Sequence, residues 1–229
     1  MKPSAVILLS GGLDSATVLA LAIRDGLSPI ALTFRYGQRH GREVAAARAV
    51  ARHFKVKVHI VHELDLRPIA KSALTSDEDV VPVGRSLKAI SQGIPATYVP
   101  SRNIIMLSIA SSLAESRGAH EVFIAAHAVD YSGYPDCRPE FFEAFEEALR
   151  KGTKTGVEGA PIRIRAPLLR MGKAEIIRLG SSLGVPFAKT WSCYLGGKRA
   201  CGRCDSCILR LKGFAEAGSL DPALYAKQK

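Results

Sequence analysis

The feature that most constrains the fold is an apolar run at residues 5–9 that leads directly into SGGLDS at residues 10–15. A helical pattern then extends from residue 16 to residue 23. This order predicts a buried strand, a tight glycine turn and a helix. Glycine lets the backbone approach a ligand closely, and the free N–H groups of the helix face that ligand. With hydroxyl and carboxylate side chains at the same turn, the segment favours a phosphate chain with its divalent cation.

No Gly-Lys-Ser/Thr triplet follows the turn, so the segment is not a Walker A loop. It resembles the SGGxDS signature of the PP-loop ATP pyrophosphatases, which cleave ATP between the α- and β-phosphates and transfer AMP to a substrate oxygen. An ordinary strand–helix turn with an Asp-Ser cap is the structural alternative. The residues expected to bind ATP are the turn and its neighbours: Leu8, Leu9, Ser10, Gly11, Gly12, Leu13, Asp14, Ser15, Ala16, Thr17 and Val18.

Strand and helix patterns alternate along the first half of the chain. Strands are expected at 5–9, 29–34, 56–61 and 121–126, and helices at 14–24, 42–54 and 103–117. This alternation predicts an α/β fold, a doubly wound, Rossmann-like parallel sheet covered on both faces. Ligands of such sheets bind at the carboxyl ends of the strands, where SGGLDS lies. Further helices are expected at 138–150, 173–183 and 208–217, and residues 71–97 are predicted to form a lid or substrate loop.

Four of the five cysteines lie near the C-terminus: Cys193, Cys201, Cys204 and Cys207. Two-residue spacers and glycines permit tight turns that bring thiolates around one ion, and four sulfurs match a closed, structural tetrahedral zinc site. An iron–sulfur cluster is the alternative, although the first spacing is wide and no Cys-x3-Cys-Pro ending follows. We therefore expect a PP-loop domain over residues 1–186 and a small zinc-binding helical segment over residues 187–229.

The chain has 229 residues, a formal net charge of +11 and 47% apolar residues. No apolar stretch reaches the roughly 20 residues that span a bilayer, and no signal peptide is recognised, so a cytoplasmic location is expected. Lys and Arg are scattered along the chain, and we find neither an aromatic single-strand platform nor an RNA-recognition signature. Direct binding of nucleic acid is therefore not expected.

The string YSGYPDCRPEF at residues 131–141 follows an expected strand end. Its tyrosines, Tyr131 and Tyr134, can stack on a planar base, while Asp136 and Arg138 can read polar edges. A rigid surface turn would explain the same composition.

Six motifs, in order, resemble the 7-cyano-7-deazaguanine synthase family, which acts in the pathway to the modified tRNA nucleoside queuosine. They are SGGLDSAT (10–17), FRYGQRH (34–40), VPSRN (99–103), DYSGYPDCRPEF (130–141), PL with KAEI (167–168 and 173–176), and TWSCY with ACGRCDSC (190–194 and 200–207). The resemblance covers nearly the whole chain. It departs at Ala125, Ala126 and His127, where the family pattern has Gly-x-Asn, and residues 66–71 contain less glycine than expected.

The resemblance implies an ATP-dependent ligase that converts 7-carboxy-7-deazaguanine and ammonia to 7-cyano-7-deazaguanine. The carboxylate is adenylated, ammonia displaces AMP to give an amide, and the amide is adenylated in turn and loses AMP to give the nitrile. Asp14, as a ligand of Mg²⁺, and Lys173, facing phosphate, are the expected catalytic residues. Substrate binding is expected from Arg39, His40, Arg102, Asn103, Tyr131, Tyr134, Asp136 and Arg138. One structural zinc per chain, Mg²⁺ with ATP, and a homodimer complete the expectation.

Two other functions are compatible with parts of the sequence. A PP-loop enzyme that thiolates tRNA or forms lysidine would suit the net charge, but no additional RNA-binding domain is recognised, and Cys137 is the one cysteine available near the nucleotide. A non-catalytic, zinc-stabilised binding module would not need the intact loop at residues 10–15.

Overall fold

The computed structural model describes residues 2–76, 78–127 and 133–227. Its centre is a five-stranded parallel sheet in the order β3-β2-β1-β4-β5. The strands are β1 (Ser4–Leu8), β2 (Ser28–Arg35), β3 (Val58–Glu63), β4 (Glu121–Phe123) and β5 (Arg163–Arg165).

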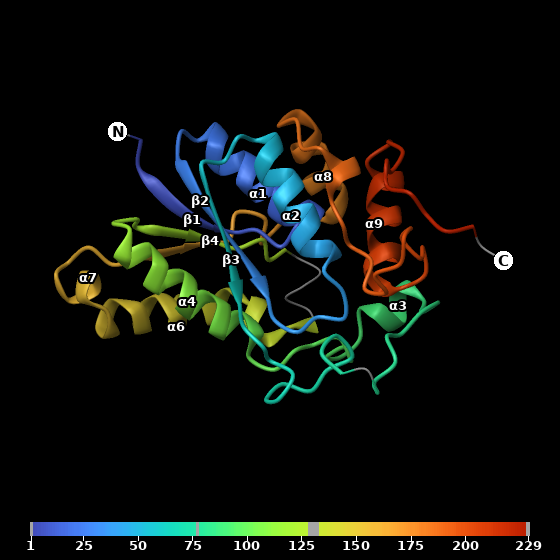
Figure 1. Ribbon diagram of the computed structural model, residues 1–229, viewed down its shortest axis with the longest axis horizontal. Coiled ribbons are helices and arrows are strands. Elements are labelled where there is room, and N and C mark those ends of the chain that lie inside the picture. The colour runs from blue at the N-terminus through green and yellow to red at the C-terminus, as the bar shows by residue number, and fades with distance from the viewer. Residues whose placement is uncertain (1, 77, 128–132, 228–229) are drawn as a thin grey trace.

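Helices cover both faces of this sheet (Figure 1). One face carries α1 (Leu13–Arg24), α2 (Arg42–His53) and α8 (Lys173–Ser182), and the other carries α4 (Arg102–Ser116) and α6 (Pro139–Gly152). The remaining elements are α3 (Leu87–Ile90), η1 (Pro135–Cys137), α7 (Lys154–Val157), η2 (Phe187–Lys189) and α9 (Asp205–Glu216). The predicted doubly wound α/β fold is confirmed.

Strand β1 shows why the core has two layers. Successive side chains of a strand point to opposite faces, and both faces of this sheet are buried. Val6 therefore packs into the cluster beneath α4 and α6, whereas Ala5 and Ile7 pack into the cluster beneath α1, α2 and α8. All three side chains have no exposed surface. The predicted continuous apolar run is thus a central strand.

The strand order indicates where the ligand crevice should lie. The chain moves from β1 outward to β2 and β3, and then returns to β4 on the other side of β1. Ligands of open α/β sheets bind where this order reverses, beyond the carboxyl ends of the strands. The loop at residues 10–15 leaves the carboxyl end of β1 at this point.

Most predicted elements lie within three residues of their observed bounds, and the differences have physical reasons. The strand expected at 121–126 ends at Phe123, because β5, which pairs with β4, is only three residues long. The pattern did not predict β5, since Ile164 is its one buried residue, between two exposed arginines. Residues 71–97, predicted as a lid or substrate loop, contain α3 and pack against the cysteine segment (Figure 1).

Within the described part of the chain, no helix is both long and apolar enough to cross a membrane.

Candidate active site and metal centre

The glycine loop packs tightly against the start of α2. Gly11 has a φ of +87°, and a Cβ added there would lie 2.3 Å from the backbone oxygen of Glu43. Glycine alone satisfies both conditions. Ser10 Oγ lies 3.0 Å from Ser15 Oγ and accepts a hydrogen bond from the backbone N–H of Gly12 at 3.3 Å. The loop therefore presents two hydroxyl groups and the N-terminus of α1 at one place, which suits an anion.

A cavity of about 270 Å³ opens beside this loop. Its walls come from the carboxyl ends of β1, β2 and β4, the first turns of α1, α2 and α4, and the residues on either side of Cys193. The lining includes apolar side chains that would suit a planar ring, namely Leu32, Phe34, Met106 and Ile124. The polar side chains of the lining are Ser10, Asp14, Ser15, Tyr36, Glu43, Arg102, Asn103, Tyr134, Cys137, Ser192, Tyr194 and Ser206.

The two residues predicted to be catalytic are in contact. Lys173 Nζ, at the first residue of α8, donates to both carboxylate oxygens of Asp14 at 2.9 Å. The ring Nε2 of His127 lies 2.8 Å from the same ammonium group, and His127 is 3% exposed. Because an ammonium group only donates, the neutral imidazole accepts this hydrogen bond. The structure thus places one cation between a carboxylate and an imidazole at the edge of the loop.

The charges of this cluster hold Asp14 ionised. Burial alone would raise the pKa of the Asp14 carboxyl, but the charge of Lys173 and the hydrogen bonds that Lys173 donates outweigh burial and hold that pKa below its usual range. A carboxylate and an ammonium group that neutralise each other can stay close together in a half-buried site.

A second group of polar residues faces the cavity from α2, α4 and the segment after β2. Glu43 is half-buried in the first turn of α2. Burial raises the pKa of its carboxyl to about 7, and the charge of Arg102 and a hydrogen bond from Gln38 offset part of that effect. Burial likewise raises the pKa of Tyr36 to about 12, with a further contribution from Glu43.

Asn103, Asp136 and Cys137 form a buried network. Asp136 Oδ2 accepts from the backbone N–H of Asn103 at 3.0 Å, and Asn103 Nδ2 donates to Asp136 O and to Cys137 Sγ, both at 3.2 Å. Asp136 is 5% exposed and is not among the described residues that line the cavity, whereas Asn103 is. The side chain of Asp136 therefore serves the start of α4.

The other residues of the tyrosine-rich string are spread out. Tyr134 lines the cavity, and its hydroxyl lies 3.0 Å from Thr97 Oγ1. Arg138 is exposed where α6 begins. Tyr131 lies outside the described residues.

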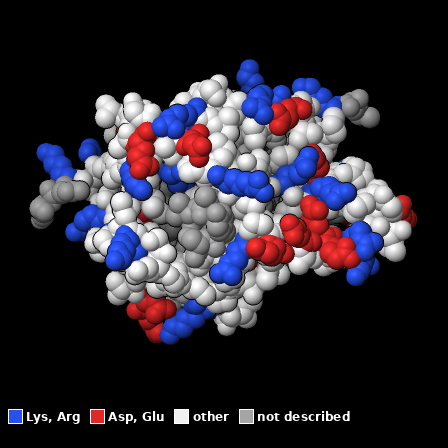
Figure 2. All heavy atoms as spheres, turned by 180° about the vertical axis from the view of Figure 1, so that it is seen from behind, with Lys and Arg blue, Asp and Glu red and all other residues white. Residues whose placement is uncertain are grey.

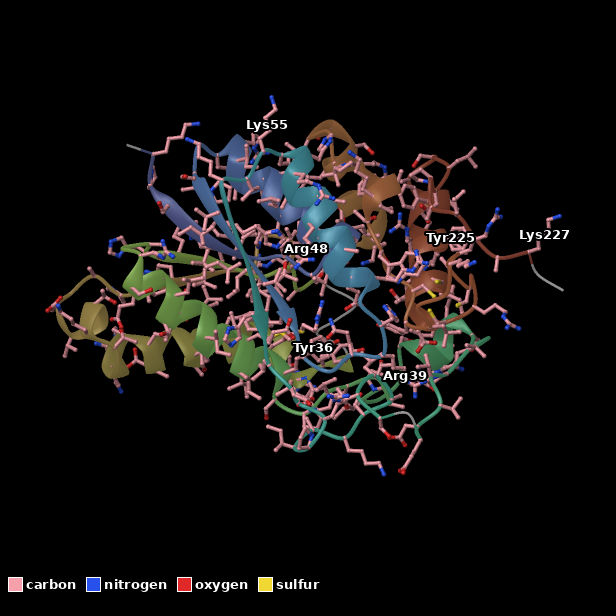
Figure 3. The ribbon with its side chains drawn as sticks, in the orientation of Figure 1. Tyr36, Arg39, Arg48, Lys55, Tyr225 and Lys227 are labelled. Carbon is pink, nitrogen blue, oxygen red and sulfur yellow. The ribbon has the colours of Figure 1, made fainter. Side chains whose placement is uncertain are left out.

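Arg39 and His40 do not line the cavity among the described residues. The guanidinium of Arg39 donates to the backbone oxygens of Ser76 and Asp79, and Figure 3 shows Arg39 close to α3, away from Tyr36. The ring of His40 packs edge-on against Trp191 and covers Gly196. Both side chains hold neighbouring loops in place.

The four predicted metal ligands converge. The sulfur atoms of Cys193, Cys201, Cys204 and Cys207 all lie within 4.8 Å of one another, and those of Cys201 and Cys207 are 3.9 Å apart. Zn–S bonds of about 2.3 Å in a tetrahedron would separate the sulfurs by about 3.8 Å. The cluster could therefore hold a metal ion such as zinc. Figure 3 shows its sulfurs beside α9, near Tyr225.

This cysteine segment is joined to the rest of the molecule on two sides. Val83 pairs with Cys204, and Arg85 forms an ion pair with Asp205 at 2.9 Å. On the side of the glycine loop, the backbone N–H of Trp191 donates to Gly11 O at 2.9 Å. A metal in the cluster would therefore stabilise both residues 71–97 and one wall of the cavity.

Two cavity residues, Glu43 and Tyr36, and the Lys173 partner His127 were not among the predicted site residues. Tyr36 and Glu43 lie in and just after the FRYGQRH segment, so the resemblance could have drawn attention to them. His127 was noted only as a departure from the family pattern. Its contact with Lys173 joins residues 46 positions apart in the sequence, and no local pattern predicts such a pair.

The surface does not gather the net positive charge into one patch on the face in Figure 2. Lys and Arg are distributed over that face, with Asp and Glu among them.

Comparison with known proteins identifies the family. A family model described as "Queuosine biosynthesis protein QueC" matches residues 4–218. A protein of Thermoplasma acidophilum named 7-cyano-7-deazaguanine synthase is 56% identical over 99% of this chain and 93% of its own length. Proteins of the same name from Anaeromyxobacter dehalogenans and Paramagnetospirillum magneticum are each 55% identical, over 97% and 99% of this chain and 96% and 100% of their own lengths. The chain therefore belongs to the QueC family of queuosine biosynthesis proteins.

Proposed function

We propose that this protein is an ATP-dependent ligase that converts 7-carboxy-7-deazaguanine and ammonia to 7-cyano-7-deazaguanine, with AMP and pyrophosphate as the nucleotide products. The observation that carries the proposal is the junction of the glycine loop, the Asp14–Lys173 pair and the cavity at the switch point of the sheet. Family membership and relatives that share this chain's length support the substrate.

The loop would hold the phosphates of ATP. Backbone N–H groups at the start of α1 and the hydroxyl groups of Ser10 and Ser15 offer hydrogen bonds to the departing pyrophosphate. The Lys173 ammonium group, fixed by Asp14 and His127, would lie beside the charge that develops as the bond between the α- and β-phosphates breaks. Preorganised charge of this kind is the main contribution that a protein makes to adenylyl transfer.

The residues at the loop fit a magnesium ion bound together with ATP. Mg²⁺ keeps several waters and is held by one or two carboxylates together with substrate phosphates. Asp14 would be the carboxylate ligand. When bound, the ion would neutralise phosphate charge and orient the pyrophosphate as a leaving group.

The four cysteines fit a structural zinc ion, because all four ligands would come from the protein and no position would remain for a water molecule. Zinc would hold residues 187–229 against the domain formed by residues 1–186. Val83 pairs with Cys204, and Arg85 forms an ion pair with Asp205. Loss of the zinc ion would therefore also release residues 71–97.

The apolar part of the cavity would receive the deazaguanine ring. Phe34, Met106 and Tyr134 offer flat or flexible surfaces for a planar heterocycle, and Arg102 offers donors for its carboxylate. Asn103 would be held in position by Asp136. We propose Arg39, His40 and Arg138 as residues that shape the surrounding loops, and a homodimer as the assembly, which size-exclusion chromatography with light scattering tests.

Product analysis tests the proposal. The full-length protein is incubated with ATP, Mg²⁺, ammonium and 7-carboxy-7-deazaguanine, and the products are identified by mass spectrometry and nucleotide chromatography. The expected products are the nitrile, AMP and pyrophosphate, with AMP formation dependent on the acid. ADP as the main nucleotide product, or AMP without any nitrile or amide, would contradict the proposed reaction.

A further inference from the structure

Glu43 contributes a second carboxylate, besides that of Asp14, to the lining of the cavity. It lies in the first turn of α2, and its own backbone oxygen packs against Gly11 of the phosphate loop. Its half-buried side chain lines the cavity together with Tyr36 and Arg102. If the glycine loop holds the phosphates of ATP, a substrate that reacts at the α-phosphate would lie in the cavity that this carboxylate lines.

Of the cavity-lining side chains that the structure describes, Asp14 and Glu43 are the two carboxylates. Asp14 is a weak proton acceptor, because both of its oxygens accept hydrogen bonds from Lys173 and its pKa is lowered. Burial raises the pKa of Glu43 to about 7 and outweighs Arg102 and Gln38, which lower it. Besides Arg102, the other ionisable side chains of the described lining are Tyr36, Tyr134, Cys137 and Tyr194.

The proposed reaction needs a proton acceptor in some of its steps and not in others. Adenylation of a carboxylate forms a C–O–P linkage and releases pyrophosphate without the loss of any proton from the substrate. Amide formation from ammonia must remove one N–H proton, and conversion of the amide to a nitrile must remove two. A base is therefore required at the nitrogen atom alone.

We propose that Glu43 is the general base that removes these protons from the substrate nitrogen, an inference that rests on the proposed function. In amide formation, the nitrogen lone pair forms the C–N bond, the C–O bond to AMP breaks with its electron pair on the AMP oxygen, and one N–H proton passes to Glu43.

In the second half, the amide oxygen attacks the α-phosphate, pyrophosphate leaves and one N–H proton passes to Glu43. The C–O bond then breaks with its electron pair on AMP, the last N–H proton passes to Glu43, and the C≡N bond forms. Glu43 releases each proton to solvent before the next transfer.

The surroundings of Glu43 suit this role. Burial raises the pKa of its carboxyl to about 7, against the opposing effects of Arg102 and Gln38. A base with a pKa near the working pH combines a large ionised fraction with sufficient proton affinity. The nitrogen steps should then be slow below about pH 7, where the carboxyl is protonated, and reach their full rate above it.

The test separates the two kinds of step in the variant Glu43→Gln. Acid adenylation is measured without ammonia, by exchange of labelled pyrophosphate into ATP in the presence of 7-carboxy-7-deazaguanine. The nitrogen chemistry is measured from the amide and ATP, so that the titration of ammonium has no influence. Glu63→Gln is the matched control, because Glu63 is an exposed carboxylate at the end of β3, paired with Arg35.

We expect Glu43→Gln to retain pyrophosphate exchange and to lose nitrile formation by about 10²- to 10⁴-fold, the usual contribution of a general base. The rate of the variant should no longer decrease below about pH 7, since the titrating carboxyl is gone. Its activity should rise at high pH, where hydroxide can replace the missing base. Glu63→Gln should match the parent in both assays.

Two results would overturn the inference. Nitrile formation at the parental rate would show that Glu43 accepts no proton, and an equal loss in both assays would show that it acts in nucleotide binding or folding. If the parent protein itself supports neither acid-dependent exchange nor nitrile formation, the proposed function fails, and the inference fails with it.

Discussion

Replacing Asp136 by alanine should destabilise the protein through the start of α4. The N-cap residue of this helix, Ser101, has a φ of +55° and makes no side-chain capping bond. Asp136 supplies the acceptor instead, from 33 residues further along the chain, to the backbone N–H of Asn103. Both residues are buried, so water cannot take the place of the lost carboxylate.

The magnitude follows from that contact. A buried hydrogen bond to a charged group is worth about 1.5–3 kcal/mol, and loss of a helix cap typically costs about 1 kcal/mol. Because these are two measures of the same contact, we expect the free energy of unfolding to fall by about 2 kcal/mol. For a chain of this length each kcal/mol lowers Tm by about 2–4 °C, so Asp136→Ala should melt about 4–8 °C below the parent.

Thermal unfolding followed by circular dichroism is the assay. Asp136→Asn keeps an oxygen acceptor and should lose less stability than Asp136→Ala. Asp25→Ala is the control, since Asp25 is exposed and pairs only with its neighbour Arg24 in the described contacts. An exposed substitution of this kind stays within about 0.5 kcal/mol.

An unchanged Tm for Asp136→Ala would refute this reasoning. It would do so most clearly if binding of 7-carboxy-7-deazaguanine fell about tenfold to a hundredfold in calorimetry, the loss expected when a buried partner of the ligand is removed. Asp136 would then read the base directly, as the sequence alone suggested.

Three further substitutions test the loop and the metal centre. Lys173→Met should slow AMP formation in single turnovers by about 10²- to 10³-fold, because it removes a preorganised charge, and a parental rate would remove Lys173 from the site. Cys204→Ser should abolish stoichiometric zinc in metal analysis and lower Tm, whereas a parental metal content and Tm would argue against a four-cysteine site. Gly11→Ala should weaken ATP binding and folding more than Gly26→Ala. Both glycines have φ near +85°, but only a Cβ added at Gly11 would meet other atoms, the nearest being Glu43 O. Equal effects of the two glycine substitutions would show that the close approach is unimportant.

The parts of the site that the sequence predicted are those encoded by neighbouring residues. The apolar run, the two glycines and the helical pattern lie within twenty residues, and the positive φ of Gly11 is a property of that residue type. The cysteine spacing also fixes its own geometry, since two short spacers leave few ways to arrange the thiolates. Both predictions concern chemistry that the local chain can complete almost alone.

The substrate residues show where local reasoning stops. Asp136 and Arg138 were selected as polar side chains beside tyrosines, and Arg39 was selected from the resemblance to the family. Polar side chains do need hydrogen-bond partners when buried. Composition does not tell whether the partner is a ligand or the protein backbone. Asp136 bonds to the start of α4, and Arg39 donates to the backbone oxygens of a neighbouring loop, so both side chains have partners within the protein.

The same reasoning explains why Glu43 and His127 became visible only in three dimensions. An isolated glutamate in the first turn of a helix is ordinary, because carboxylates stabilise helix N-termini. Glu43 is distinctive because it lines the cavity together with Arg102 of α4, whose charge acts on it. His127 is distinctive because Lys173 of α8 lies 2.8 Å from its ring. Parallel strands gather residues from distant parts of the chain at one edge of the sheet, so the chemistry of such a site depends on crossovers that no single segment encodes.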